Sequence, residues 1–426
     1  MAEIKHPAQL RPETDVLTRG FDPSLSVGSA RPAVFRSSTY VFSSPEAAER
    51  AFDLMGGRGQ RTPGENVDLV YSRFNHPNAQ ILEDQILPLE PGATGAIVFN
   101  SGMAAIMTAL LAVLNPGDSI IYTVPIYGGT QTLIQGFLQP FGIRGIPVPA
   151  GQSEAIDQAI RTANNLRVIF IETPANPTIV MTDIRRACNT VAALHSTSTN
   201  GSTGYDRPIV MIDNTFLGPA FQHPLTLGAD LSLYSATKYL GGYSDIIGGV
   251  ALTKDAGLMT KIRGKRSLFG NILQPDECWI LDTRLPTVTL RMNRQSKNAQ
   301  RIAEQLANHP KIRKIYYPTL FDDGEQTRIF REQCDYPGGL VSIDLKGGKS
   351  AAFDLLRNLR LARNAVSLGG VETLACHPRS TTHSAWSAKD LDEAGISEGL
   401  VRVSLGIENW RDLLNDFEHA LEQVAH

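Results

Sequence analysis

The chain has 426 residues, of which 42% are hydrophobic and 19% are charged, and its formal net charge is −3. This length exceeds what one hydrophobic core usually supports, so we expect two packed domains of a globular protein. The small net charge gives no broad attraction for nucleic acid, which we exclude as a partner.

The N-terminal 70 residues show no regular hydrophobic period, and the Gly-, Pro- and Asn-rich segment 56–66 predicts a loop. The first residues, MAEIKHPAQLRPETD, mix charge with proline where a secretory signal needs an apolar run, so no export is expected.

The four cysteines are far apart and form no CxxC pair; they are Cys188, Cys278, Cys334 and Cys376. This spacing predicts neither a disulfide framework nor a zinc site, and it favours the reducing cytoplasm.

Further along, β-like runs alternate with helical stretches, a pattern that predicts a parallel α/β sheet; the runs are 96–99, 119–124, 168–172, 209–213 and 231–235. The apolar run 103–114 falls short of the roughly 20 residues that a bilayer requires. We therefore predict a buried helix there and no membrane association. The segment 196–204, rich in Ser, Thr and Gly, reads as a surface loop.

After about residue 276 the pattern changes. An amphipathic helix is expected around 298–306, followed by strands in GLVSIDL and LVRVSL. A final helix is expected where apolar residues recur at helical spacing: Trp410, Leu413, Leu414, Phe417, Leu421 and Val424. These elements predict a second, α+β domain.

Polar residues follow several of the predicted buried strands, and open α/β sheets bind ligands at these strand ends. Gly102 and Met103 begin a helix after the first strand, where backbone amides favour an anion. Asp213 ends the strand 209–213, and Lys238 follows the strand 231–235. A small turn alone is often only a helix cap, and a lone lysine is usually solvated, so the prediction depends on their combination.

Motifs along nearly the whole chain resemble one family, the Cys/Met-metabolism enzymes that use pyridoxal 5′-phosphate (PLP), among them cystathionine γ-synthase, cystathionine γ-lyase, methionine γ-lyase and O-acetylhomoserine sulfhydrylase. The motifs, in order, are YSRFNHPN at 71–78, SGMAA at 101–105, YGGT at 127–130, ETPANPT at 172–178, DNTF at 213–216, SATKY at 235–239, SLGGVETL at 367–374 and LVRVSLGIE at 400–408. The resemblance implies the type I, aspartate-aminotransferase-like fold: an N-terminal arm (1–74), a PLP-binding domain (75–275) and a C-terminal domain (276–426).

The resemblance also implies a cofactor site. Lys238 would carry PLP covalently, and Asp213 would face its pyridine nitrogen. The phosphate would be held by the amides of Gly102 and Met103, the hydroxyls of Ser235 and Thr237, and Tyr71 and Arg73 from a neighbouring subunit. A homodimer would then be the minimal active unit, and the family suggests a homotetramer.

On the substrate side, the resemblance implies that Arg402, helped by Asn176 and Ser367, grips the carboxylate. Tyr127 would stack on the cofactor ring and move a proton at the substrate amine or the departing γ-group. His377 and His383 lack a carboxylate at ligand spacing, and we expect no metal site.

Three positions depart from the family pattern. Gly129 stands where methionine γ-lyases carry a cysteine, which weakens a preference for methionine. Val366 stands where cystathionine-processing members tend to carry a glutamate, which weakens cystathionine. Tyr243 replaces an expected histidine without an evident reason.

The resulting hypothesis is a PLP-dependent γ-elimination on a γ-substituted L-amino acid such as methionine, a homoserine derivative or canavanine. The products would be 2-oxobutyrate and ammonia, or a vinylglycine-derived product. γ-Replacement by a thiol uses the same residues and stays open. A hypothesis of another class is a PLP or amino-acid sensor without turnover, which the imine-forming Lys238 argues against.

Overall fold

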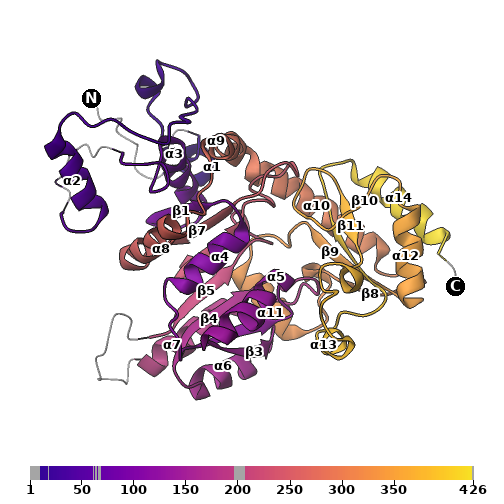
Figure 1. Cartoon of the computed structure of the whole chain (residues 1–426). Coiled ribbons are helices and arrows are strands. Elements are labelled where there is room, and N and C mark those ends of the chain that lie inside the picture. Colours follow the sequence, from indigo (N-terminus) through magenta and orange to yellow (C-terminus); the bar gives the residue numbers. More distant parts are fainter. Residues whose placement is uncertain are drawn as a thin grey trace.

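The computed structural model describes residues 10–424 apart from 18, 61, 63–64, 66–68 and 196–206 (Figure 1). The predicted loop 196–204 lies outside the described residues, as does part of the predicted loop 56–66. Within the described ranges, no helix has both the length and the apolar character that a membrane crossing needs.

The larger sheet has seven strands in the order β1-β7-β6-β5-β4-β2-β3, and only β7 runs antiparallel to its neighbours. Its strands are β1 (Gly95–Phe99), β2 (Ser119–Val124), β3 (Arg144–Pro149), β4 (Leu166–Glu172), β5 (Ile209–Asp213), β6 (Leu231–Ser235) and β7 (Gly249–Thr253). All five predicted strands are present, and β3 and β7 are additional. The predicted mostly parallel α/β sheet is therefore confirmed.

Helices cover both faces of this sheet, because successive strand side chains point to opposite sides. Phe170 in β4 packs on the side of α4 (Gly102–Leu111) and α8 (Ala256–Phe269). Its neighbours Ile169 and Ile171 pack on the other side, against α6 (Ser153–Thr162) and α7 (Ile184–His195). The helix α4 contains most of the apolar run 103–114, so the prediction of a buried helix there is confirmed.

The N-terminal part contains α1 (Pro12–Asp15), α2 (Pro45–Met55) and α3 (Pro77–Ile86), drawn in indigo and violet in Figure 1. The eleven-residue helix α2 contradicts the expectation of an irregular segment before residue 70. Its start follows from the sequence: Ser44 accepts a hydrogen bond from Ala47 N at 3.1 Å, and proline is favourable at the first helical position.

The smaller sheet has five strands in the order β10-β11-β12-β9-β8. Its strands are β8 (Ile312–Tyr316), β9 (Leu340–Leu345), β10 (Arg363–Asn364), β11 (Leu374–Cys376) and β12 (Leu400–Ser404). Helices of this C-terminal half are α9 (Pro275–Arg284), α10 (Val288–Leu306), α11 (Gly324–Gln333), α12 (Gly348–Asn358), α13 (Ala388–Glu393) and α14 (Trp410–Glu422). The predicted α+β character is confirmed, and we propose that the domain boundary lies near residue 276, at the start of α9.

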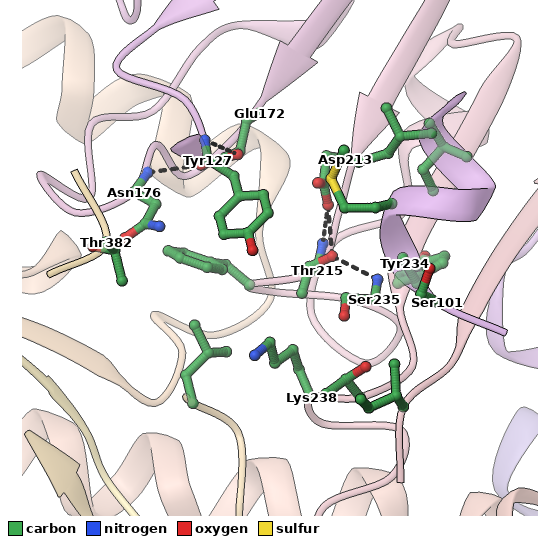
Figure 2. A pocket seen from close by; sticks show the side chains of 18 of the residues that line it. Ser101, Tyr127, Glu172, Asn176, Asp213, Thr215, Tyr234, Ser235, Lys238 and Thr382 are labelled. Atoms are coloured by element: carbon green, nitrogen blue, oxygen red, sulfur yellow. Dashed lines mark hydrogen bonds between the residues drawn. The ribbon is translucent and has the colours of Figure 1, made fainter. Parts of the chain in front are cut away.

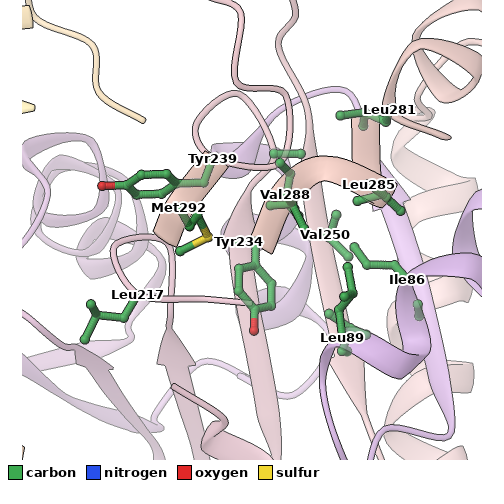
Figure 3. Close-up of a cluster of buried hydrophobic side chains, with 14 of the residues drawn as sticks. Ile86, Leu89, Leu217, Tyr234, Tyr239, Val250, Leu281, Leu285, Val288 and Met292 are labelled. Atoms are coloured by element: carbon green, nitrogen blue, oxygen red, sulfur yellow. The ribbon is translucent and has the colours of Figure 1, made fainter. Parts of the chain in front are cut away.

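One buried cluster connects the two halves (Figure 3). Ile86 of α3 and Val250 of β7 pack in it together with Leu285 and with Val288 and Met292 of α10. The later part of α10 enters a second core around the smaller sheet, which includes Ala299, Ile302, Leu306, Val341, Val403 and Phe417. The helix α10 is thus shared by two cores.

Candidate active site

A cavity of about 240 Å³ lies where the strands β4, β5 and β6 end (Figure 2). Ligands in open α/β sheets bind at this edge. The cavity is lined by most of the residues that the sequence predicted: Gly102, Met103, Tyr127, Asn176, Asp213, Ser235, Thr237, Lys238 and Arg402.

Lys238 lies three residues beyond the end of β6 and projects into the cavity (Figure 2). Its Nζ donates a hydrogen bond to Ser367 Oγ at 3.1 Å, which brings the predicted Ser367 to the site. Burial, and then the positive charge of Arg402, lowers the pKa of Lys238 to about 8. The lowered pKa favours the neutral amine, the form in which a nucleophile or base acts.

Asp213 is the last residue of β5, and its carboxylate is buried. Asp213 Oδ1 accepts hydrogen bonds from Thr215 Oγ1 at 2.6 Å and from Thr215 N at 3.1 Å. Burial raises the pKa of Asp213, and the two bonds from Thr215 oppose that rise. A cationic partner in the cavity would favour the ionised form of this carboxyl group.

Gly102 begins α4 and approaches Ser235 closely. A Cβ atom at Gly102 would lie 2.9 Å from Ser235 Cβ, so only glycine fits. Ser101 caps α4 by accepting from Ala104 N at 3.0 Å, and the amides of the first turn, which include Gly102 and Met103, have no acceptor within the helix. Together with the Ser235 and Thr237 hydroxyls they suit an anion such as a phosphate.

Arg402 in β12 is 2% exposed, and all residues of this strand are buried, so both of its faces are covered. Its Nη1 donates to Asn176 Oδ1 at 2.9 Å, and its Nη2 donates to the carbonyls of Val366 at 2.7 Å and Ser367 at 3.2 Å. Among the described residues, the buried Arg402 Nε has no acceptor. This free donor suits a carboxylate ligand.

Tyr127 is 43% exposed and stands at the start of α5 (Gly128–Thr132), with its ring in the cavity (Figure 2). The ring lies close over Gly129, where an added Cβ atom would come within 2.6 Å of Tyr127 Cε1. Glycine at position 129 therefore leaves room for this orientation of the ring.

Tyr71 and Arg73 are the predicted site residues that the fold does not bring together with the others. Neither is among the described residues that line the cavity of their own chain. Arg73 Nη1 donates to Ser267 O at 2.6 Å, and Tyr71 forms a β-bridge with Thr39 and is exposed. Their predicted role in a neighbouring subunit stays a prediction.

Glu172 and Thr215 are among the lining residues for which the sequence predicted no role. Glu172 ends β4 directly beside Asp213 in the strand register, and burial, followed by the charge of Asp213, raises the pKa of Glu172. Thr215 holds Asp213, as described above. Glu172 could have been noticed in the sequence, because it is an acidic residue at the end of a buried strand, at the same edge of the sheet as Asp213.

Tyr243, His377 and His383 each have a structural setting outside the proposed chemistry. Tyr243 packs beneath the guanidinium groups of Arg284 and Arg291, at 4.8 and 5.7 Å from its ring centroid. His377 bonds to Ser380 Oγ at 2.8 Å and to the Glu398 carbonyl at 3.0 Å. Burial lowers the pKa of His383 to about 4. The described residues contain no group of three or more His, Cys, Asp or Glu side chains that could hold a metal ion.

Comparisons with known proteins agree with this geometry. Residues 13–422 match the family model described as Cys/Met metabolism PLP-dependent enzyme. The chain is 37% identical to the L-methionine gamma-lyase of Fusobacterium nucleatum subsp. nucleatum, covering 93% of this chain and 94% of the relative. It is 35% identical to the cystathionine gamma-synthase of Mycobacterium bovis, covering 96% of each.

Among solved structures, the chain is similar to cystathionine gamma synthase from Xanthomonas oryzae pv. oryzae in complex with cystathionine. The TM-score is 0.86 at 30% identity, over 98% of this chain and 99% of the other. The fold is thus the type I fold of PLP enzymes.

The cavity itself fits PLP. The close approach at Gly102 and the free amides of α4 suit its phosphate, and the buried carboxylate of Asp213 suits a protonated pyridine nitrogen. Lys238, with its lowered pKa, suits the aldehyde group. The chain belongs to the Cys/Met-metabolism family of PLP-dependent enzymes, and pyridoxal 5′-phosphate is its cofactor.

Proposed function

We propose that this enzyme eliminates the γ-substituent of an L-amino acid and releases 2-oxobutyrate and ammonia. PLP, when bound, supplies an electron sink for charge that develops at the substrate Cα. Lys238 takes the Cα proton, gives it up again, and then takes a Cβ proton, and a water molecule is consumed when the oxo acid and ammonia are released. Tyr127 gives a proton to the departing γ-group.

The observation that carries this proposal is that Lys238 lies close to Arg402 and Asn176, the residues proposed to bind the substrate carboxylate, which we call the carboxylate clamp. Lys238 Nζ is 3.1 Å from Ser367 Oγ, and the Ser367 carbonyl accepts from Arg402 Nη2. A substrate whose carboxylate is held by Arg402 and Asn176 therefore has its Cα next to Lys238. Such positioning provides a large share of catalysis, because the reacting atoms are already oriented.

The surroundings of the cavity favour an uncharged γ-substituent. Val366 is 55% exposed, Ile247 is 64% exposed, and both line the cavity. The two carboxyl groups that line it, Glu172 and Asp213, are buried and already hydrogen-bonded. A distal ammonium such as that of cystathionine would find no free carboxylate among the described lining residues. We propose methionine or a homoserine derivative ahead of cystathionine, and canavanine stays an alternative.

γ-Replacement by a thiol is the second candidate, because the similarity to cystathionine gamma-synthase is as extensive as that to the lyases. A panel of γ-substituted amino acids, assayed with and without an added thiol, separates the possibilities. We expect 2-oxobutyrate without thiol. A thioether that forms only when thiol is present would indicate replacement. PLP-loaded protein that turns over no member of the panel would support the sensor.

Substituting Gly129 tests the proposed role of Tyr127. Gly129→Ala places a methyl group 2.6 Å from Tyr127 Cε1 and must displace the ring, so we expect kcat/KM to fall by about tenfold or more. The control is Gly136→Ala, because a Cβ atom there meets only Thr132 Cγ2 at 3.7 Å. Equal activities of the two variants would contradict a role for the position of the Tyr127 ring.

We also propose a cytoplasmic homodimer as the minimal active unit, with a homotetramer as the full assembly. The support is that Tyr71 and Arg73 lie outside the cavity of their own chain, on the N-terminal segment. Such a segment can complete the site of a partner.

Subunit mixing tests this arrangement. Arg73→Ala and Lys238→Ala homo-oligomers are each expected to be inactive, whereas mixed oligomers contain some sites with both residues intact. Activity should therefore return after co-refolding and be measurable with the best substrate of the panel. If confirmed mixed oligomers stay inactive, Arg73 serves the site of its own subunit.

A further inference from the structure

Glu172 connects two separate walls of the cavity. The residue is 4% exposed, and each carboxylate oxygen accepts one backbone N–H (Figure 2). Oε2 accepts from Tyr127 N at 2.8 Å, and Oε1 accepts from Asn176 N at 2.9 Å. The Glu172 backbone is itself fixed, because its N–H donates to Thr123 Oγ1 at 3.1 Å.

The two donors belong to different loops with different proposed tasks. Tyr127 stands between β2 and α5 and presents the phenol. Asn176 follows β4, and its Oδ1 accepts from Arg402 Nη1 at 2.9 Å. Hydrogen bonds therefore link Glu172 to Asn176, and Asn176 to Arg402, the arginine proposed to bind the substrate.

The geometry of this position suits a side chain with two acceptor oxygens. A backbone N–H can only donate, so two converging N–H groups need two acceptor atoms on one side chain. Glutamine has the same length but offers one acceptor, and its amide nitrogen would face a second donor. Burying a carboxyl group is costly unless it is hydrogen-bonded. These two bonds lower the pKa of Glu172 and oppose the effect of burial.

We propose that Glu172 is a positioning residue that anchors the Tyr127 loop and the Asn176 loop to one carboxylate and so fixes the phenol relative to the carboxylate clamp. The catalytic part of this inference rests on the proposed function. The anchoring part does not depend on which substrate is used.

The first test measures the anchor directly in the full-length holoenzyme by hydrogen exchange of the Tyr127 and Asn176 amides. In Glu172→Gln, one or both amides lose their acceptor, and we expect their exchange to accelerate by about tenfold, as for a lost hydrogen bond worth about 1.4 kcal/mol. Unchanged exchange at both amides would overturn the proposal.

The matched control is Glu90→Gln. Glu90 is also fully buried, but its two closest donors are the hydroxyls of Tyr234 and, at 3.0 Å, Ser232, and its single backbone donor, Leu225 N, lies farther away at 3.4 Å. Hydroxyl groups can rotate to suit an amide, unlike backbone N–H groups. Exchange at Tyr127 and Asn176 should therefore stay as in the wild type. If exchange accelerated equally in Glu90→Gln, the effect would follow from the loss of any buried carboxylate rather than from the loss of the anchor. That result would overturn the proposal.

The second test is a double-mutant cycle in kcat/KM with Asn176→Ala, using the best substrate of the panel. Glu172→Gln should raise KM more than it lowers kcat, and its loss should be smaller in the Asn176→Ala background, because part of its effect acts through that side chain. Fully additive losses would contradict the coupling.

Two safeguards keep the outcomes distinguishable. If no amino acid is turned over, the proposed function fails but the exchange measurement still tests the anchor. If the glutamine variant does not fold, Glu172→Asp takes its place. Aspartate keeps two acceptor oxygens, but its side chain is one methylene group shorter. It should therefore reach only one of the two amides, so that the exchange of the other amide accelerates. Wild-type exchange at both amides in this variant would overturn the proposal.

Discussion

Lys238→Ala is expected to abolish turnover, by at least about 1,000-fold, while the protein keeps its fold. The side chain is the only primary amine among the described residues that line the cavity, and its removal deletes both the covalent link to PLP and the proposed proton carrier. The measurement is the rate of oxo-acid formation, together with circular dichroism and the visible absorbance of the bound cofactor.

The matched control for this variant is Lys254→Ala. Lys254 is exposed just beyond β7, so its removal deletes a lysine without touching the cavity. Its activity and absorbance should equal those of the wild type. A Lys238→Ala enzyme with normal turnover would refute the assignment of the cofactor lysine, and so would a wild-type protein that cannot take up PLP.

Asp213→Asn is expected to retain some cofactor and to lower kcat by about 100-fold to 1,000-fold. Asparagine keeps the oxygen that accepts both bonds from Thr215, so the local backbone is preserved. It removes the negative charge that would keep the pyridine nitrogen protonated, and it can turn an N–H donor toward that group. Charge at the substrate Cα would then lose its sink.

For this second variant, kcat and the dissociation constant for PLP should be measured separately. Asp245→Asn is a suitable control, because that exposed carboxylate pairs with Arg284 outside the cavity. Near-normal kcat in Asp213→Asn would show that the carboxylate does not act on the pyridine nitrogen.

Much of the cavity could be located from the sequence, because its residues follow recognisable buried strands. Asp213 ends the run IVMID and Lys238 follows the run LSLYS, and parallel strands bring their carboxyl ends to one edge. Arg402 was harder to place. An arginine within an alternating strand is usually solvated, and only the family motif distinguished it from a surface residue.

The place of Glu172 at the end of a buried strand could be predicted, but its role could not, because that role depends on two backbone amides that approach from other loops. In the sequence it resembles an ordinary acidic residue at the end of a strand. The direction of β7 was equally hidden, since the short apolar run GVALT carries no information about its orientation. The helix α2 was missed although Ser44 and Pro45 form a recognisable helix start, because the surrounding segment is rich in loop residues.

The shared helix α10 has a consequence for recombination between relatives. Val288 and Met292 belong to the core beneath the larger sheet, whereas Ala299 and Ile302 belong to the core of the smaller sheet. A crossover at residue 276 would therefore pair the first half of α10 from one parent with packing partners such as Ile86 and Val250 from the other. Closely packed interiors tolerate such mismatches poorly. The C-terminal part of this chain consequently cannot be exchanged alone between relatives. Functional hybrids will require that the apolar partners of α10 come from the same parent as α10.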